Sequence, residues 1–135
     1  DAERGRELFT KATCAGCHRI GEQGGVAGPD LTRIGAIRSG QDLLESILYP
    51  SSSFAQGFEP HSLKRRDGEE VFGNIVVQGP DGVRLRDAAG IVHHTRPEEI
   101  ISLERHPLST MPAGLEELLT RRQFGDLLAY LQSLK

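Results

Sequence analysis

The chain has 135 residues, of which 37% are hydrophobic, with five phenylalanines, two tyrosines and no tryptophan. This length suits one domain, or one small domain that carries an insertion. Its 16 basic and 19 acidic side chains give a formal net charge of −3, and the one basic run, at residues 64–66, is followed at once by acidic residues. We interpret that run as a solvated strand end. The composition therefore excludes a nucleic-acid-binding surface, and no apolar run is long enough to form a stable membrane span.

The first 53 residues have a helical pattern with a long loop in the middle. Residues 2–12 predict a short helix with Leu8 and Phe9 facing inward. Several glycines between residues 24 and 35 indicate an irregular wrap of chain. A second helix is predicted after Ser39, because Ser39 as N-cap and Asp42 at the third helical position form an acidic variant of the capping box. Pro50 is expected to end this helix.

The sequence pattern changes between residues 54 and 106 to short alternating runs separated by turn sequences. One of these is the Asp-Gly pair at 67–68, a strong hairpin signal. Val71, Ile75 and Val77 are expected on one face of a strand broken by Gly73. Further strands are predicted around Val83 and Leu85, at 91–92 and at 100–103. We expect an antiparallel meander of four or five strands, either open or curled into a small barrel.

A helical pattern returns near the C-terminus. Thr120 and Gln123 form a second capping box. One face of the helix that follows carries Phe124, Leu127, Leu128, Leu131 and Leu134. We therefore expect an α+β fold, in which 1–53 and 107–135 form one helical unit and 54–106 is an inserted antiparallel β unit.

The strongest chemical signal is Cys14-Ala15-Gly16-Cys17-His18, which holds the only two cysteines. The C-x-x-C-H pattern is the attachment signature of a c-type haem. Two thiols at this spacing can each add to a vinyl group of one porphyrin, and His18 then becomes the proximal ligand of the iron. A zinc site would need a second pair of ligands, and a redox dithiol would need a βαβ setting. The sequence therefore predicts one covalently bound haem c.

Met111, the only methionine, is the leading candidate for the sixth ligand. A neutral thioether raises the reduction potential of a haem iron, as an electron carrier requires, and Pro112 stiffens the loop that presents the sulfur. His106, beside Pro107, is the alternative, since a rearranged loop could bring it to the iron. The other histidines, His61, His93 and His94, are expected at the surface, and His93 and His94 should point to opposite faces of a strand.

These residues resemble those of class I cytochromes c, and the matching pieces fall in the family's order. They are Gly5 and Phe9, the motif at 14–18, Gly28-Pro29-Asp30-Leu31, Met111-Pro112, and the helical run at 126–131. The resemblance implies that the carbonyl of Pro29 accepts a hydrogen bond from the ring of His18. It also implies that the Gly5/Phe9 turn packs across the helix that carries Tyr130. Haem contacts are thus expected at Cys14, Cys17, His18, Pro29 and Met111, with His18 and Met111 as metal ligands.

The whole chain also resembles the haem-binding cytochrome c domain with a β insertion that is common in planctomycetes and related bacteria. The phrases that carry this resemblance are residues 28–31, 47–51 and 109–115. Such domains often lie at the C-terminus of large secreted proteins. Because c-type haem is attached outside the cytoplasm, we expect a periplasmic or otherwise extracytoplasmic location, with a signal or upstream domain that this chain does not include.

The predicted function is single-electron transfer to or from a redox partner protein, a dehydrogenase or an oxidase. No catalytic base, nucleophile or second cofactor is evident, so no enzymatic activity is expected. One alternative is a haem-based sensor in which CO, NO or peroxide displaces Met111, and another is the electron-accepting module of a larger dehydrogenase. For the segment 54–106 two roles remain open. It is either a strut that braces the Met111 loop or a docking surface for a partner or a second copy of the chain.

Overall fold

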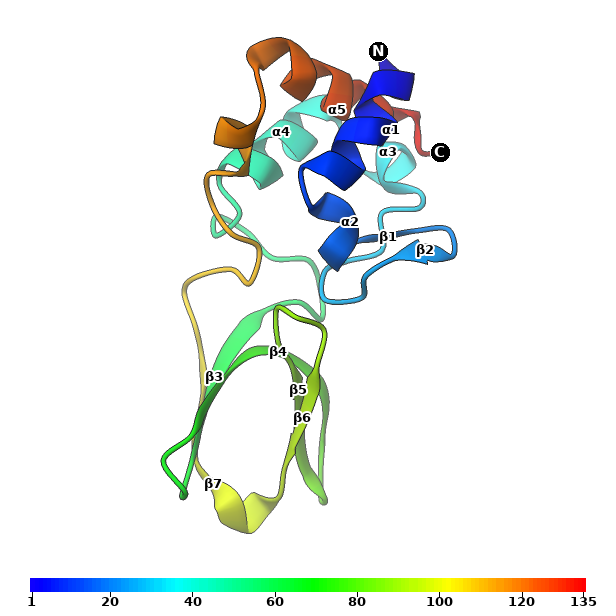
Figure 1. Cartoon of the computed structure of the whole chain (residues 1–135). Helices are drawn as coiled ribbons and strands as arrows, with labels where there is room; N and C mark the ends of the chain where they lie inside the picture. The colour runs from blue at the N-terminus through cyan, green and yellow to red at the C-terminus, as the bar shows by residue number, and fades with distance from the viewer.

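The computed structural model describes residues 1–135, and the chain folds into a helical part and a β part placed end to end (Figure 1). Both termini lie in the helical part. None of the helices combines the length and the hydrophobicity that a membrane span requires. The α+β fold class predicted from the sequence is confirmed.

The helical part contains α1 (Ala2–Lys11), α2 (Cys14–Cys17), the two-residue strands β1 (Arg19–Ile20) and β2 (Gln23–Gly24), α3 (Ile34–Ile37), α4 (Gly40–Leu48), the 3₁₀ helix η2 (Leu115–Leu118) and α5 (Arg121–Ser133).

Both predicted capping boxes are present. The Ser39 hydroxyl accepts a hydrogen bond from the backbone N–H of Asp42, whose carboxylate accepts one from the backbone of Ser39, at the start of α4. Thr120 and Gln123 make the same exchange at the start of α5. These caps fix where both helices begin. The buried faces of these two helices and of α1 form the helical core, in which Phe9, Leu43, Leu127 and Leu131 pack together.

Helices α1 and α5 cross at very close range. A Cβ at Gly5 would clash with the backbone oxygen of Asp126 and would lie 2.6 Å from the Cβ of Tyr130. The rings of Phe9 and Tyr130 meet edge-to-face, with centroids 6.0 Å apart. The packing of the Gly5/Phe9 turn against the helix of Tyr130 therefore agrees with the expectation from the class I cytochromes c.

An ion pair between exposed Arg4 and the buried carboxylate of Asp126 crosses the same contact. Asp126 is only 6% exposed, and its carboxylate accepts hydrogen bonds from Arg4 Nε at 2.8 Å and Arg4 Nη2 at 3.2 Å. The bond from Arg4 is the main reason why the pKa of Asp126 lies well below its usual range. The sequence pattern gave no sign that this acidic residue is buried.

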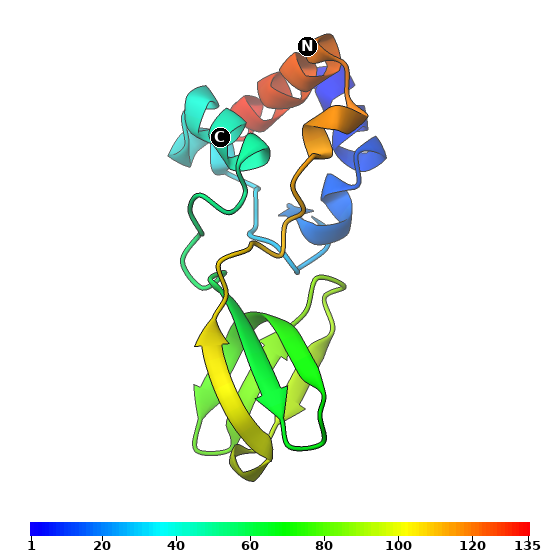
Figure 2. The same ribbon diagram turned by 90° about the vertical axis from the view of Figure 1, so that its left-hand side faces the viewer.

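The β part is a curled, antiparallel five-stranded sheet (Figures 1 and 2). Its strands are β3 (Pro60–Arg65), β4 (Glu70–Gly79), β5 (Gly82–Arg86), β6 (Val92–Thr95) and β7 (Ile100–Arg105), in the order β6-β5-β4-β3-β7. A separate core of Leu63, Val71, Val83 and Leu85 lies on its inner face. The predicted meander is found for β3 to β6 but is wrong for β7. The 3₁₀ helix η1 (Pro97–Glu99) leads β7 back to pair with β3, and β6 and β7 do not close a barrel.

The return of β7 brings the two ends of the β segment together. Pro60 starts β3, and its carbonyl accepts a hydrogen bond from the backbone N–H of His106 at 2.8 Å. The chain therefore leaves and re-enters the helical part side by side (Figure 2).

Two details of the strand prediction are wrong. Gly73 does not break β4, which runs continuously through it, because a hydrogen side chain is what lets the strand approach the backbone of Arg86. Val77 does not share the inner face with Ile75, because a register shift between them turns Val77 outward to 50% exposure. Of strand β3, only the end at residues 64–66 and the hairpin after it were predicted, since Leu63 is its only strongly apolar residue after Pro60.

Candidate functional site

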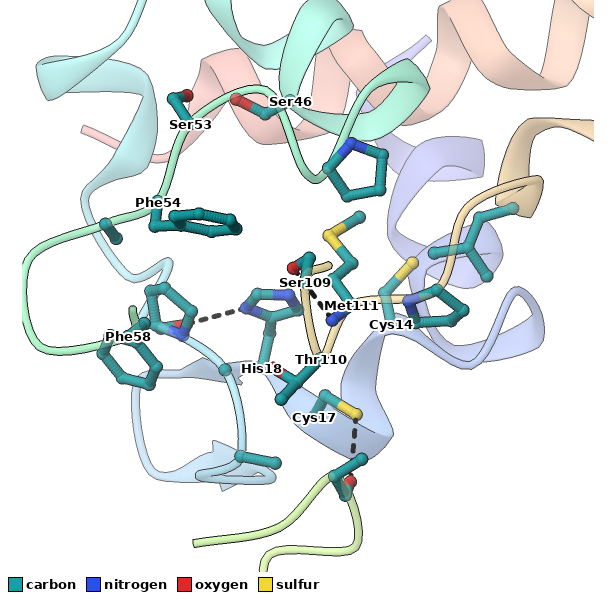
Figure 3. A pocket seen from close by; sticks show the side chains of 18 of the residues that line it. Cys14, Cys17, His18, Ser46, Ser53, Phe54, Phe58, Ser109, Thr110 and Met111 are labelled. Carbon is teal, nitrogen blue, oxygen red and sulfur yellow. Dashed lines mark hydrogen bonds between the residues drawn. The ribbon is translucent and has the colours of Figure 1, made fainter. Parts of the chain in front are cut away.

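A cavity of about 460 Å³ lies in the helical part, beside the loops that connect it to the sheet (Figure 3). This volume falls within the roughly 300–1,000 Å³ of small-molecule and cofactor sites. All the site residues predicted from the sequence line this cavity: Cys14, Cys17, His18, Pro29 and Met111. Four of them lie between residues 14 and 29, and the fold brings Met111 from a distant segment to the same cavity.

The single turn of α2 presents the two cysteines. Cys14 begins the turn and is half-buried, and burial raises the pKa of its thiol. Cys17 ends the turn, and its Sγ lies 3.8 Å from the backbone oxygen of Ala88, which belongs to the turn between β5 and β6. The sheet therefore reaches the attachment motif directly at Cys17.

The ring of His18 is oriented by the segment that follows β2. Its Nδ1 lies 2.8 Å from the carbonyl oxygen of Pro29. A carbonyl can only accept, so Nδ1 carries the hydrogen. Burial lowers the pKa of His18, which keeps the imidazole neutral near pH 7. Nε2 is then left with a free lone pair, the form in which histidine ligates a metal.

Gly28 lies flat against the same ring. A Cβ at this position would be 2.6 Å from His18 Cε1 and 2.9 Å from Nδ1. The backbone N–H of Gly28 also donates to the carbonyl of Cys17 at 2.8 Å. Only glycine leaves room for the imidazole at this contact, so the Gly28-Pro29 pair both seats and orients His18.

Met111 reaches the cavity from the loop between β7 and η2. Figure 3 shows its thioether and the His18 imidazole extending into the same space. The loop is tied to the end of α4 through two serines. The hydroxyl of Ser109 accepts from the backbone N–H of Met111 at 3.1 Å, and that of Ser51 accepts from the backbone N–H of Ser109 at 3.0 Å. A smaller apolar cavity of about 50 Å³ also touches Cys14, His18 and Met111.

Several wall residues were not predicted. Ala88 carries no chemical signal in the sequence, and Phe54 and Phe58 fall in the segment assigned to the β unit. Arg38 is the only basic side chain on the wall apart from His18, and it offers a cation to an anionic group on a bound cofactor. The acidic residues Asp42 and Glu45 also line the wall, so Arg38 is the group placed to meet the carboxylates of a haem, and the free nitrogen of His18 is placed to meet its iron.

The four remaining histidines do not line the cavity. His93 Nε2 lies 2.7 Å from Asp87 Oδ2, and His94 Nε2 lies 2.9 Å from the carbonyl oxygen of Asp81, so the two rings do point apart. The ring of His106 packs edge-to-face on Phe72 of β4, with centroids 4.6 Å apart. No group of three or more His, Cys, Asp or Glu side chains is arranged to hold a metal ion.

Comparison with known proteins agrees with this geometry. The family model described as Cytochrome c matches residues 2–75, which is more than half of the chain. The chain belongs to the cytochrome c family. It is accordingly a haem-binding c-type cytochrome of the electron-transfer kind, whose haem c is covalently attached and which exchanges electrons with a redox partner protein. A search of curated proteins finds no match to the chain.

The family match covers one part of the site and leaves Met111 outside it. It includes Cys14, Cys17, His18 and Pro29, and it ends inside β4, well before Met111. Members of the family are typically electron carriers rather than enzymes, and their domains are commonly extracellular or periplasmic. The position of Met111 is thus described by the structure of this chain and not by the family match.

Proposed function

We propose that this chain carries single electrons through one haem c attached to Cys14 and Cys17, with His18 and Met111 as the axial ligands of its iron. The observation that carries the proposal is the convergence of these four side chains on one cavity from two segments, residues 14–18 and the Met111 loop, which lie far apart in the chain. Bound haem c supplies one-electron redox chemistry, and the protein sets the energy at which it operates.

The proximal side supports this assignment through the state of His18. Its Nδ1 hydrogen is committed to Pro29, and its Nε2 lone pair is free in the cavity. A ligand histidine that donates its other N–H to a carbonyl has a fixed ring orientation and increased basicity. The geometry of His18, Gly28 and Pro29 is therefore that of a pre-organised proximal ligand.

The distal side supports Met111 over His106. Met111 lines the cavity, whereas His106 packs on Phe72 of the sheet and accepts a hydrogen bond from the backbone of Leu108. Bringing His106 to the cavity would require breaking these contacts. A thioether ligand favours the reduced iron and suits a carrier of relatively high potential.

We further propose that residues 1–53 and 107–135 form the haem-binding unit and that 54–106 is an insertion. Two separate hydrophobic cores support this division, one between the helices and one inside the sheet. A periplasmic site of action and a dehydrogenase or oxidase as redox partner complete the proposal. The proposed location and the proposed kind of partner both rest on the resemblance of the chain to the planctomycete-type haem-binding domain.

Absorption spectra of the ferric, ferrous and CO-exposed holoprotein test the proposal. We expect a low-spin ferric spectrum with a sulfur-to-iron charge-transfer band, and slow or no binding of CO to the ferrous protein. Rapid CO binding by the wild-type protein would favour the sensor function instead. A spectrum typical of bis-histidine ligation would overturn Met111 and point to His106.

A further inference from the structure

The sheet contacts the segment that orients His18. In Figure 1 this segment, between β2 and α3, lies on the side of the helical part that faces the sheet. Asn74 of β4 donates from Nδ2 to the carbonyl of Ala27, with a distance of 3.4 Å. Arg86 of β5 donates from Nη1 to the carbonyl of Val26, at 3.1 Å. Two adjacent strands thus grip two consecutive carbonyls of one loop.

The side chains of Asn74 and Arg86 act together, because they lie next to each other on the sheet. Asn74 and Arg86 are directly opposite each other in the β4–β5 pairing, so their side chains leave the same face of the sheet. This is the outer face, because Val71 and Leu85, their neighbours of opposite parity, lie in the inner core. Asn74 is nevertheless only 3% exposed, and Ala27 only 4%. The loop covers this end of the outer face.

The gripped residues lead directly to the proximal ligand. Gly28 follows Ala27 and lies against the His18 ring, and the carbonyl of Pro29 accepts the hydrogen bond from Nδ1. The carbonyls of Val26 and Ala27 are hydrogen-bonded to the sheet. The position of the Pro29 carbonyl, a few residues further on, therefore depends on where β4 and β5 hold this loop.

Stability alone is a poor explanation for these polar residues. Asn74 Oδ1 and Arg86 Nε are buried and have no hydrogen-bond partner in the protein. Buried polar atoms without partners destabilise a fold, and an apolar pair of similar size would avoid this. What the polar pair provides, and an apolar pair cannot, is a directional hold on the carbonyls of Val26 and Ala27.

We propose that Asn74 and Arg86 are positioning residues through which the β sheet fixes the Pro29 carbonyl against His18 and so sets the reduction potential of the haem. The proposal rests on the proposed function, since it takes His18 as an axial ligand. It assigns the sheet a role on the proximal side of the haem, in addition to its contact with Cys17. Loosening the grip weakens the hydrogen bond to His18, makes the imidazole a poorer donor and raises the potential.

Asn74→Ala and Arg86→Ala, each measured as the intact holoprotein, test this inference. Arg84→Ala is the matched control, because Arg84 lies on the same strand and face, carries the same charge and makes no hydrogen bond to the loop. We expect both test variants to have a higher midpoint potential than the wild type. We also expect the His18 Nδ1 hydrogen to exchange with solvent about tenfold faster by NMR, while Arg84→Ala changes neither quantity.

The outcomes separate the two proposals. If the wild-type protein lacks the sulfur-to-iron band, the proposed ligation fails, whatever the variants do. If the band is present and neither potential nor exchange changes in the variants, the positioning role is overturned while the ligation stands. Should Asn74→Ala not yield holoprotein, Arg86→Ala decides the question, because Arg86 is partly exposed and its removal opens less of the interior.

Discussion

Replacing Gly28 with alanine should change the reduction potential of the haem although no ligand is replaced. The added Cβ would lie 2.6 Å from His18 Cε1 and 2.9 Å from Nδ1. Carbon atoms in favourable contact are about 3.5–4.0 Å apart, so either the ring or the loop must move by roughly 1 Å. Pro29 adjoins Gly28, so either movement separates the carbonyl from Nδ1.

The consequence for the hydrogen bond follows from its present length. Nδ1 and the Pro29 oxygen are 2.8 Å apart, and N–H···O bonds extend to only about 3.2 Å. A movement of roughly 1 Å therefore removes most of the interaction. If the bond favours the oxidised iron by about 1 kcal/mol, its loss raises the midpoint potential by about 40 mV. Overpacking should also lower the free energy of unfolding by about 1–3 kcal/mol.

Potentiometric titration of Gly28→Ala measures this shift, and Gly16→Ala is the control. Gly16 lies between the two cysteines, and a Cβ there would meet nothing within 4 Å. We expect the potential of Gly16→Ala to equal that of the wild type. A Gly28→Ala protein with lower stability but an unchanged potential would refute the reasoning, because it would show that the Pro29 hydrogen bond does not influence the iron.

Three further predictions concern attachment, acid stability and the sheet. A mass spectrum under denaturing conditions should show the mass of the polypeptide plus one haem. Acidified organic solvent should release the haem only when both Cys14 and Cys17 are replaced by alanine. Release from the wild type would contradict covalent attachment. Because the folded pKa of Asp126 is depressed, its stabilisation is complete above the unfolded pKa of about 3.9 and is lost as the pH falls below it. The urea midpoint should therefore fall more steeply between about pH 4 and pH 2 in the wild type than in Asp126→Asn, and parallel curves would exclude the ion pair as the cause. If the sheet is a strut, replacing 57–104 with a Gly/Ser linker should weaken the sulfur-to-iron band from Met111 and quicken CO uptake. If the sheet is a docking surface, the same replacement should leave the spectrum intact but abolish self-association or electron transfer to the partner. An unchanged spectrum with unchanged association would defeat both roles.

Local sequence signals predicted much of the fold. Capping boxes and apolar periodicity placed α4 and α5, because these patterns act within one helix. The pairing of β7 with β3 could not be predicted in this way, since strand order depends on contacts between residues far apart in the chain. The burial of Asp126 was missed for the same reason, because its partner Arg4 lies on another helix.

The site residues also fall into two groups, those that a local motif reveals and those that only tertiary contacts bring to the site. Cys14, Cys17 and His18 form a local motif whose chemistry requires that spacing, so the sequence alone identifies them. Ala88 lies beside Cys17 only because the β5–β6 turn folds back onto the helical part, and no feature of an alanine in a turn signals this. The grip of Asn74 on the loop of Ala27 likewise depends on how the sheet docks.

X-ray absorption at the iron edge of the ferric holoprotein tests the central claim most directly, because it counts the sulfur ligands of the iron. Ligation by His18 and Met111 predicts one sulfur in the first coordination shell of the wild type and none in Met111→Ala. A wild-type shell that contains only nitrogen, or a Met111→Ala shell that is identical to the wild type, would contradict the account.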